Sequence, residues 1–150
     1  MIAFLGTSAL IPLLISEESS ETLRTLLRED RRIVISSITP LEITSVLWRL
    51  RHGDQIGLAE NHAAESAFGE LSSSWREIGF SARVAEVALD LFSRCPLRTL
   101  DAIQLATVSS LRDVSALLPF VVMDKKLRAA ARAEASPSCR SPEFPCSNPR

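Results

Sequence analysis

The chain has 150 residues, 46% of them hydrophobic, and its 17 basic and 18 acidic side chains give a formal net charge of −1 at pH 7. That length predicts one domain that buries roughly 70% of the surface of the unfolded chain. A net charge so close to zero excludes general electrostatic attraction to nucleic acid, so any phosphate binding must come from a local patch.

Strands and helices are predicted to alternate along the chain. The hydrophobic pattern predicts strands over residues 2–5, 32–36, 76–80 and 120–123. Helical spacing predicts helices over residues 7–15, 23–30, 39–52, 58–75, 82–94, 100–111 and 125–135. This alternation is typical of an α/β fold with a parallel sheet and crossover helices. We expect one domain over residues 1–135, followed by a Pro/Ser-rich, disordered tail over residues 136–150.

The sequence carries no sign of a membrane span or of a secretory signal. Apolar runs are short and broken by charges, and the start, residues 1–5, has no basic segment before its strand-like run. Cys95, Cys139 and Cys146 are unevenly spaced and form no C-x-x-C pair, which argues against a disulfide framework and a zinc site. We therefore expect no membrane association and a location in a reducing cytoplasm.

The segment Leu97–Ala106 has apolar residues all round a helical wheel, which predicts a buried helix. It holds a single carboxylate, Asp101, and an ionised Asp in such surroundings is costly unless a cation or several donors meet it. Asp101 can be explained as a first-turn acid that the helix dipole stabilises, with Thr99 as N-cap. The alternative is a metal ligand at the edge of the core.

Two more acids follow predicted strands. Glu42 lies in the first turn of a helix, and Asp124 directly follows the last strand. In an open α/β sheet these positions meet at the carboxyl ends of the strands, where converging carboxylates suit Mg²⁺. Helix capping explains them equally well, because Glu42 is in place for a capping box with Thr39 and Asp124 for an N-cap.

Four segments, in this order, resemble the PIN domain of VapC-type toxins. They are residues 2–10 (IAFLGTSAL), 35–42 (ISSITPLE), 100–106 (LDAIQLA) and 121–127 (VVMDKKL). The resemblance covers about residues 1–135 and implies a three-layer fold with a parallel sheet and flanking helices. It also implies Mg²⁺- or Mn²⁺-dependent hydrolysis of RNA phosphodiester bonds, with Glu42, Asp101 and Asp124 as the catalytic, metal-binding acids. A homodimer and an antitoxin that plugs the site are further implications.

Several polar side chains near the acids are candidates for contact with substrate. The resemblance implies Ser8 or Thr7 as a polar helper, although both can equally be plain helix caps. Arg98 adjoins Asp101 closely in sequence and is a candidate contact for the RNA backbone; a solvated helix face is the competing explanation. For Lys125 and Lys126 we favour the solvated face.

Gly6 departs from the family pattern, because the first strand of the family normally ends in an Asp that binds metal. With Gly6, the site has one carboxylate fewer, and both metal affinity and geometry should suffer. A weakened ribonuclease is therefore one interpretation, and a catalytically inactive module that retains antitoxin binding is the other. A phosphoacceptor receiver domain ranks last, because it requires an acidic pair where this chain has Gly6 and Thr7.

Overall fold

The computed structural model describes residues 2–15, 23–25, 32–112 and 118–135. Its sheet has four parallel strands in the order β3-β2-β1-β4. The strands are β1 (Ile2–Leu5), β2 (Arg32–Ser36), β3 (Arg76–Ile78) and β4 (Phe120–Val121). In register, Phe4 of β1 lies between Val34 of β2 and Phe120 of β4. The predicted parallel α/β sheet is confirmed.

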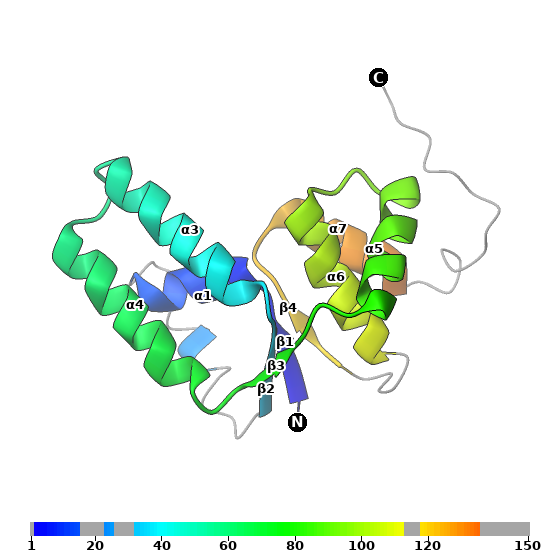
Figure 1. The fold of residues 1–150 in the computed structure, drawn as a ribbon, viewed down its shortest axis with the longest axis horizontal. Helices are drawn as coiled ribbons and strands as arrows, with labels where there is room; N and C mark the ends of the chain where they lie inside the picture. Colours follow the sequence, from blue (N-terminus) through cyan, green and yellow to red (C-terminus); the bar gives the residue numbers. More distant parts are fainter. Residues whose placement is uncertain (1, 16–22, 26–31, 113–117, 136–150) are drawn as a thin grey trace.

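Helices cover both faces of this sheet (Figure 1). One layer contains α1 (Thr7–Leu14), α3 (Thr39–His52) and α4 (Leu58–Ser72), and the other contains α5 (Ala82–Arg94), α6 (Thr99–Arg112) and α7 (Lys125–Ala135). The three-layer arrangement agrees with the fold that the family resemblance implied.

The alternation of side chains along β1 explains how the sheet holds two cores. Ala3 and Leu5 are buried in the cluster that includes residues of α1, α3 and α4. Phe4, between them in sequence, is fully buried on the opposite face with Val34 and with Val108 of α6. Successive residues of a strand point to opposite faces, so an uninterrupted apolar strand needs helices on both sides.

Most predicted element boundaries are confirmed to within a few residues. The helix expected over residues 58–75 ends at Ser72, and the strands expected over 76–80 and 120–123 are shorter. Ser81 caps α5 as a good N-cap should, with its Oγ accepting from the N–H of Val84 at 3.3 Å. Most of the helix expected over residues 23–30 and the whole tail over 136–150 lie outside the described residues.

In the part of the chain that the structure describes, no helix is both long enough and apolar enough to cross a membrane.

Candidate functional site

The carboxyl ends of β1 and β4 are tied together where the candidate acids gather. The N–H of Gly6, directly after β1, donates to the carbonyl oxygen of Val121 at the end of β4, at 3.0 Å. Since the strands are parallel, the helices that follow them begin along this same edge. The first turns of α3 and α6 hold Glu42 and Asp101, and Asp124 directly precedes α7.

Asp101 is the acid whose surroundings most disfavour its charge. Its pKa is raised above the ordinary value, first by burial and then by the negative charges of Asp124 and Glu42; the positive charge of Arg98 opposes the shift. Glu42 and Asp124 therefore both lie near enough to Asp101 for their charges to disfavour its ionised form. This finding weighs against the first explanation of Asp101, in which the helix N-terminus stabilises the carboxylate.

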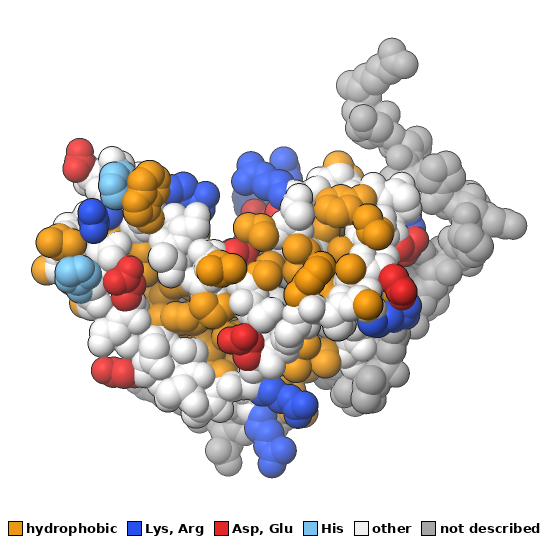
Figure 2. Space-filling model, viewed as in Figure 1, with side chains coloured by type: hydrophobic (Ala, Val, Ile, Leu, Met, Phe, Trp, Pro, Cys, Tyr) orange, Lys and Arg blue, Asp and Glu red, His pale blue; other side chains and the backbone are white. Residues whose placement is uncertain are grey.

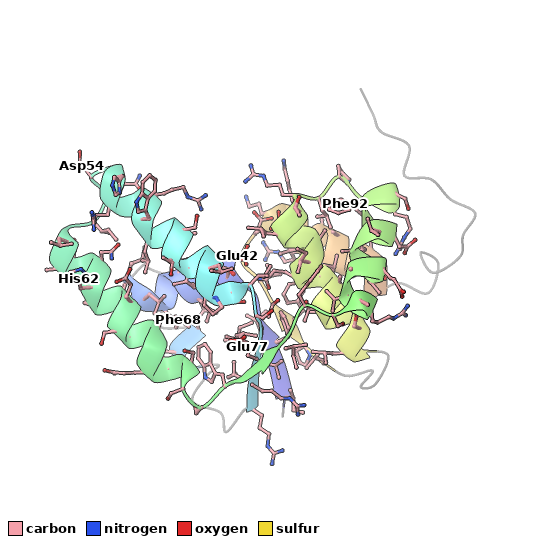
Figure 3. All side chains as sticks on the ribbon, viewed as in Figure 1. Glu42, Asp54, His62, Phe68, Glu77 and Phe92 are labelled. Carbon is pink, nitrogen blue, oxygen red and sulfur yellow. The ribbon has the colours of Figure 1, made fainter. Side chains whose placement is uncertain are left out.

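Glu42 is held by two polar side chains from other helices. The hydroxyl of Thr7 in α1 donates to Oε2 of Glu42 at 2.6 Å, and Nε2 of Gln104 in α6 donates to the same oxygen. Nε2 of Gln104 also donates to Oγ1 of Thr7 at 2.8 Å. Glu42 is labelled in Figure 3 where α3 approaches α6, between the two helical layers. Thr7 is buried, so it lies behind the carboxylate rather than on an open surface.

Asp124 is fixed through its backbone and through one carboxylate oxygen. Oγ of Ser8 accepts from the N–H groups of Met123 and Asp124, at 3.0 and 3.2 Å. Oδ1 of Asp124 accepts from the N–H of Leu127 at 2.8 Å, so Asp124 caps α7 as predicted. Ser8 therefore sets where the chain turns from β4 into α7. Neither Ser8 nor Thr7 caps α1, whose N-cap is Gly6.

Two predicted helix caps are wrong. Helix α3 already includes Thr39, and its N-cap is Ile38, so Thr39 makes no capping box with Glu42. Helix α6 likewise includes Thr99, which is therefore its first residue and not its N-cap. In both cases the helix begins one residue earlier than the side-chain chemistry suggests. The carboxylate of Glu42 is left to bond Thr7 and Gln104 instead.

Gly6 is buried and lies against an aromatic ring of β4. A Cβ at this position would meet Cε2 of Phe120 at 3.1 Å and the carbonyl oxygen of Val121 at 3.6 Å. The φ and ψ of Gly6 are −80° and 154°, which any residue adopts. The backbone conformation at position 6 is therefore compatible with an Asp, but the ring of Phe120 would have to shift by a few tenths of an ångström.

Cationic side chains lie close to two of the acids in the sequence. Arg98, Lys125 and Lys126 are exposed, and Arg98 is near enough to act on Asp101 electrostatically. The space-filling view shows a hollow between the α3 side and the α6–α7 side of the molecule, with Lys and Arg side chains gathered at its rim (Figure 2). A local patch of this kind is what phosphate binding requires in a chain with a net charge near zero.

The two tryptophans differ in burial. Trp75 is partly buried and packs against Phe68, with ring centroids 6.4 Å apart. Trp48 is 57% exposed and stacks on His52, so it is not a core residue. His52 and His62 are both exposed, as expected of ordinary surface residues.

Gln104 is the site residue that sequence analysis missed. The available signal was a polar residue in the middle of a helix that is otherwise apolar all round, three positions after Asp101. A buried amide needs hydrogen-bond partners, so its presence in such a helix indicates a polar neighbour from another element. Here those neighbours are Thr7 and Glu42.

The donor set of the site fits a hard divalent cation in its chemistry. Carboxylates and hydroxyls are the ligands that Mg²⁺ prefers, and a cation would relieve the repulsion that raises the pKa of Asp101. Among the described residues, no three His, Cys, Asp or Glu side chains come together closely enough to hold an ion outright. Water and substrate phosphate normally complete the shell of Mg²⁺, so the acids do not need to do so alone.

Parallel strands with helices on both faces define an α/β protein whose candidate acids lie along the carboxyl edge of the sheet. The chain matches the family model of the PIN domain over residues 3–133. It therefore belongs to the PIN domain family.

Several solved structures share the fold. VapC20 of Mycobacterium tuberculosis, described as a Sarcin-Ricin loop cleaving toxin, has a TM-score of 0.64 and 21% identity over 87% of this chain and 95% of its own. A toxin-antitoxin complex from Klebsiella pneumoniae has a TM-score of 0.62 and 23% identity, covering 85% of this chain and 90% of that one. VapBC2 from Rickettsia felis, bound to a DNA fragment from its promoter, has a TM-score of 0.55 and 18% identity, covering 83% and 100%. No curated protein sequence matches significantly.

Proposed function

We propose that this chain is a VapC-type toxin, an endoribonuclease that hydrolyses RNA in a Mg²⁺- or Mn²⁺-dependent reaction. Members of the PIN family are generally ribonucleases, and structures with the same fold include a toxin that cleaves the sarcin-ricin loop. The observation that carries the proposal is the placement of Glu42, Asp101 and Asp124 at helix starts along the carboxyl edge of the sheet, where the charges of Glu42 and Asp124 both raise the pKa of Asp101. Burial and two neighbouring negative charges disfavour the ionised form of Asp101, which is a poor arrangement for stability alone.

In this mechanism Glu42, Asp101 and Asp124 would hold the cation. A bound Mg²⁺ would activate a water molecule and neutralise charge on the scissile phosphate. Thr7 and Gln104 fix the carboxylate of Glu42, and Ser8 fixes the backbone of Asp124. Arg98, exposed beside Asp101, would bind the RNA backbone.

Gly6 favours a second candidate, a catalytically inactive PIN module that still binds an antitoxin. Residue 6 adjoins the acids but brings no side chain to them, so the site has fewer carboxylates than the family pattern implies. In the first candidate the remaining three acids bind the cation more weakly than a site with the additional Asp would, and cleavage is slower than with such a site. In the second they do not support cleavage.

An antitoxin is the proposed protein partner in both cases. Two structures with this fold are toxin-antitoxin assemblies, one of them bound to promoter DNA. We also propose a homodimer, since α3 leaves two large apolar side chains exposed seven positions apart on one helix face, Leu41 by 72% and Trp48 by 57%.

Cleavage of a mixed single-stranded RNA in Mg²⁺ and in Mn²⁺ tests the function. The parent chain is compared with Gly6→Asp and Asp101→Asn, and Glu65→Gln is the matched control because it removes one exposed carboxylate from α4, away from the site. EDTA should abolish any activity that depends on the metal.

Each pattern of activity has one meaning. Cleavage by the parent and by Glu65→Gln, but not by Asp101→Asn, would support a working ribonuclease with three acids. Cleavage only after Gly6→Asp would mean that the fold is intact but the site of the parent chain is inactive. The inactive antitoxin-binding module would then be the better conclusion. No cleavage by any variant would refute the ribonuclease proposal.

A further inference from the structure

Gln104 is a polar side chain in one of the most buried stretches of the molecule. It is 2% exposed, and its helical neighbours Ala102, Leu105 and Ala106 are each 0% exposed. A long amide side chain in such a place loses its hydration and its rotamer freedom. Some interaction must compensate for that cost.

The amide of Gln104 closes a ring of hydrogen bonds around one oxygen of Glu42. Its two N–H groups reach Oγ1 of Thr7 and Oε2 of Glu42, and the hydroxyl of Thr7 donates to the same Oε2. The more distant Oγ1 of Thr39, 3.5 Å from Nε2, adds little. The reverse orientation of the amide would place its carbonyl oxygen against a carboxylate oxygen, so repulsion fixes the orientation observed.

Holding Glu42 in this way leaves the other end of the amide unsatisfied. Oε1 of Gln104 is buried and has no hydrogen-bond partner among the described residues. A buried acceptor without a partner carries its full desolvation penalty, which an apolar residue of similar volume such as Met would avoid. This penalty offsets part of what the hydrogen bonds to Thr7 and Glu42 contribute, so stability alone does not require a Gln here, and the unsatisfied group calls for a functional explanation.

We propose that Gln104 is a positioning residue for the cation site: together with Thr7 it locks Oε2 of Glu42, so that Oε1 is the oxygen with which Glu42 meets a divalent cation. This inference rests on the metal dependence of the proposed function. Without Nε2, the carboxylate of Glu42 can rotate and can offer either oxygen. Binding of the cation would then have to fix the orientation of the Glu42 carboxylate, and the lost rotational entropy would weaken the binding.

Binding of Mn²⁺, measured by titration calorimetry without RNA, tests the proposal. Gln104→Met removes both the donors and the unsatisfied acceptor at nearly constant volume. We expect it to weaken Mn²⁺ binding by about 10-fold, as loss of a group that orients a metal ligand typically does. The lost hydrogen bonds to Thr7 and Glu42 and the removed unsatisfied acceptor act in opposite directions, so we expect thermal stability without metal to stay close to that of the parent. Thr7→Val should also weaken Mn²⁺ binding, because it removes the hydroxyl that donates to Glu42. Thr7→Ser keeps a hydroxyl and should bind Mn²⁺ like the parent.

Ser109→Ala is the matched control for the loss of a buried unsatisfied group. Oγ of Ser109 is also buried in α6 without a hydrogen-bond partner among the described residues. Its removal should leave Mn²⁺ affinity unchanged. A second readout is the side-chain amide signal of Gln104 in the metal-free protein by NMR, which should shift on Glu42→Gln substitution.

The outcomes separate this inference from the proposed function. Mn²⁺ binding that Gln104→Met weakens, with no RNA cleavage by the parent, would refute the ribonuclease and leave the positioning role standing. Unchanged Mn²⁺ affinity in Gln104→Met would overturn the positioning role even if RNA is cleaved. The positioning role would also be overturned if the side-chain amide signal of Gln104 did not shift on Glu42→Gln substitution, or if the parent chain bound no Mn²⁺.

Discussion

The ring of Phe120 occupies the space beside Gly6, with Cε2 only 3.1 Å from where a Cβ of residue 6 would lie. Phe120 also packs edge-to-face on Phe4, with ring centroids 5.7 Å apart. The small residue at position 6 and the large one at position 120 are therefore matched to one another. Restoring an acid at position 6 must take that match into account.

Gly6→Asp should raise Mn²⁺ affinity and lower stability. Overpacking against Phe120 should reduce the free energy of unfolding by about 1 kcal/mol. Residue 6 directly follows β1 at the edge of the sheet where the helices with the candidate acids begin, so we expect the added carboxylate to supply a further oxygen ligand and calorimetry to show tighter binding than in the parent.

Gly6→Ala is the control for this substitution, because it adds the Cβ without the carboxylate. It should show the same loss of stability in urea unfolding, with no gain in Mn²⁺ affinity. If Gly6→Asp binds Mn²⁺ no more tightly than Gly6→Ala, residue 6 does not face the site. Combining Gly6→Asp with Phe120→Leu should relieve the contact.

Asp101 should make the metal-free protein less stable as the pH rises. Its folded-state pKa is raised, so the folded chain holds this proton more tightly than the unfolded chain. The resulting stabilisation is present below the unfolded pKa of about 3.9 and is lost as the pH rises through the higher folded value. Asp101→Asn should therefore increase the urea midpoint in EDTA near neutral pH and flatten its dependence on pH.

The same variant decides between the two explanations of Asp101. If the helix N-terminus stabilised the charge, Asp101→Asn would lower the urea midpoint at neutral pH. Adding Mg²⁺ supplies a second comparison. It should stabilise the parent and have much less effect on Asp101→Asn, because the variant lacks one of the proposed ligands.

Sequence patterns predicted the layers of this fold well because its strands and helices have distinct periods. The unbroken apolar run of β1 correctly indicated a strand buried on both faces. The boundaries of helices were less predictable. Thr39 and Thr99 have the chemistry of N-caps, but backbone hydrogen bonding starts each helix one residue earlier.

The candidate site was only partly predictable for a physical reason. Glu42, Asp101 and Asp124 follow from local position, since each lies at a helix start beyond a strand. The contact between Gln104 and Thr7 spans 97 positions in the chain. It arises where helices from the two faces of the sheet come close at its carboxyl edge, which no local spacing specifies. The crowding of Gly6 by Phe120 is likewise a product of strand register.

The ion pair that joins α5 to α7 should stabilise the fold more than its exposed neighbour does. Arg94 donates to Glu134 at 2.7 Å and also to Asp90. The side chain of Glu134 is 16% exposed and that of Asp90 is 61% exposed. Glu134→Gln should therefore lower the free energy of unfolding by about 1–3 kcal/mol, and Asp90→Asn by less than about 1 kcal/mol. Equal losses in urea unfolding would show that burial of the pair makes no difference.

Arg98 should contribute to RNA binding through a phosphate contact. It is exposed, and it lies near enough to Asp101 to lower the pKa of that acid against the larger opposing effects. In the Asp101→Asn background, which prevents cleavage, Arg98→Gln should weaken RNA binding similarly for all sequences. The slope of log K against log salt should fall by about 0.7, the value for one phosphate contact on a single strand.

Arg83→Gln is the control for Arg98→Gln, because Arg83 is an exposed arginine on α5 with a side-chain exposure of 63%. It removes the same charge from the same helical layer but away from the acids. If the two variants change the salt slope equally, RNA responds only to overall charge, and Arg98 makes no specific contact. If only Arg98→Gln lowers the slope, the phosphate backbone passes beside Asp101, where the proposed hydrolysis requires it.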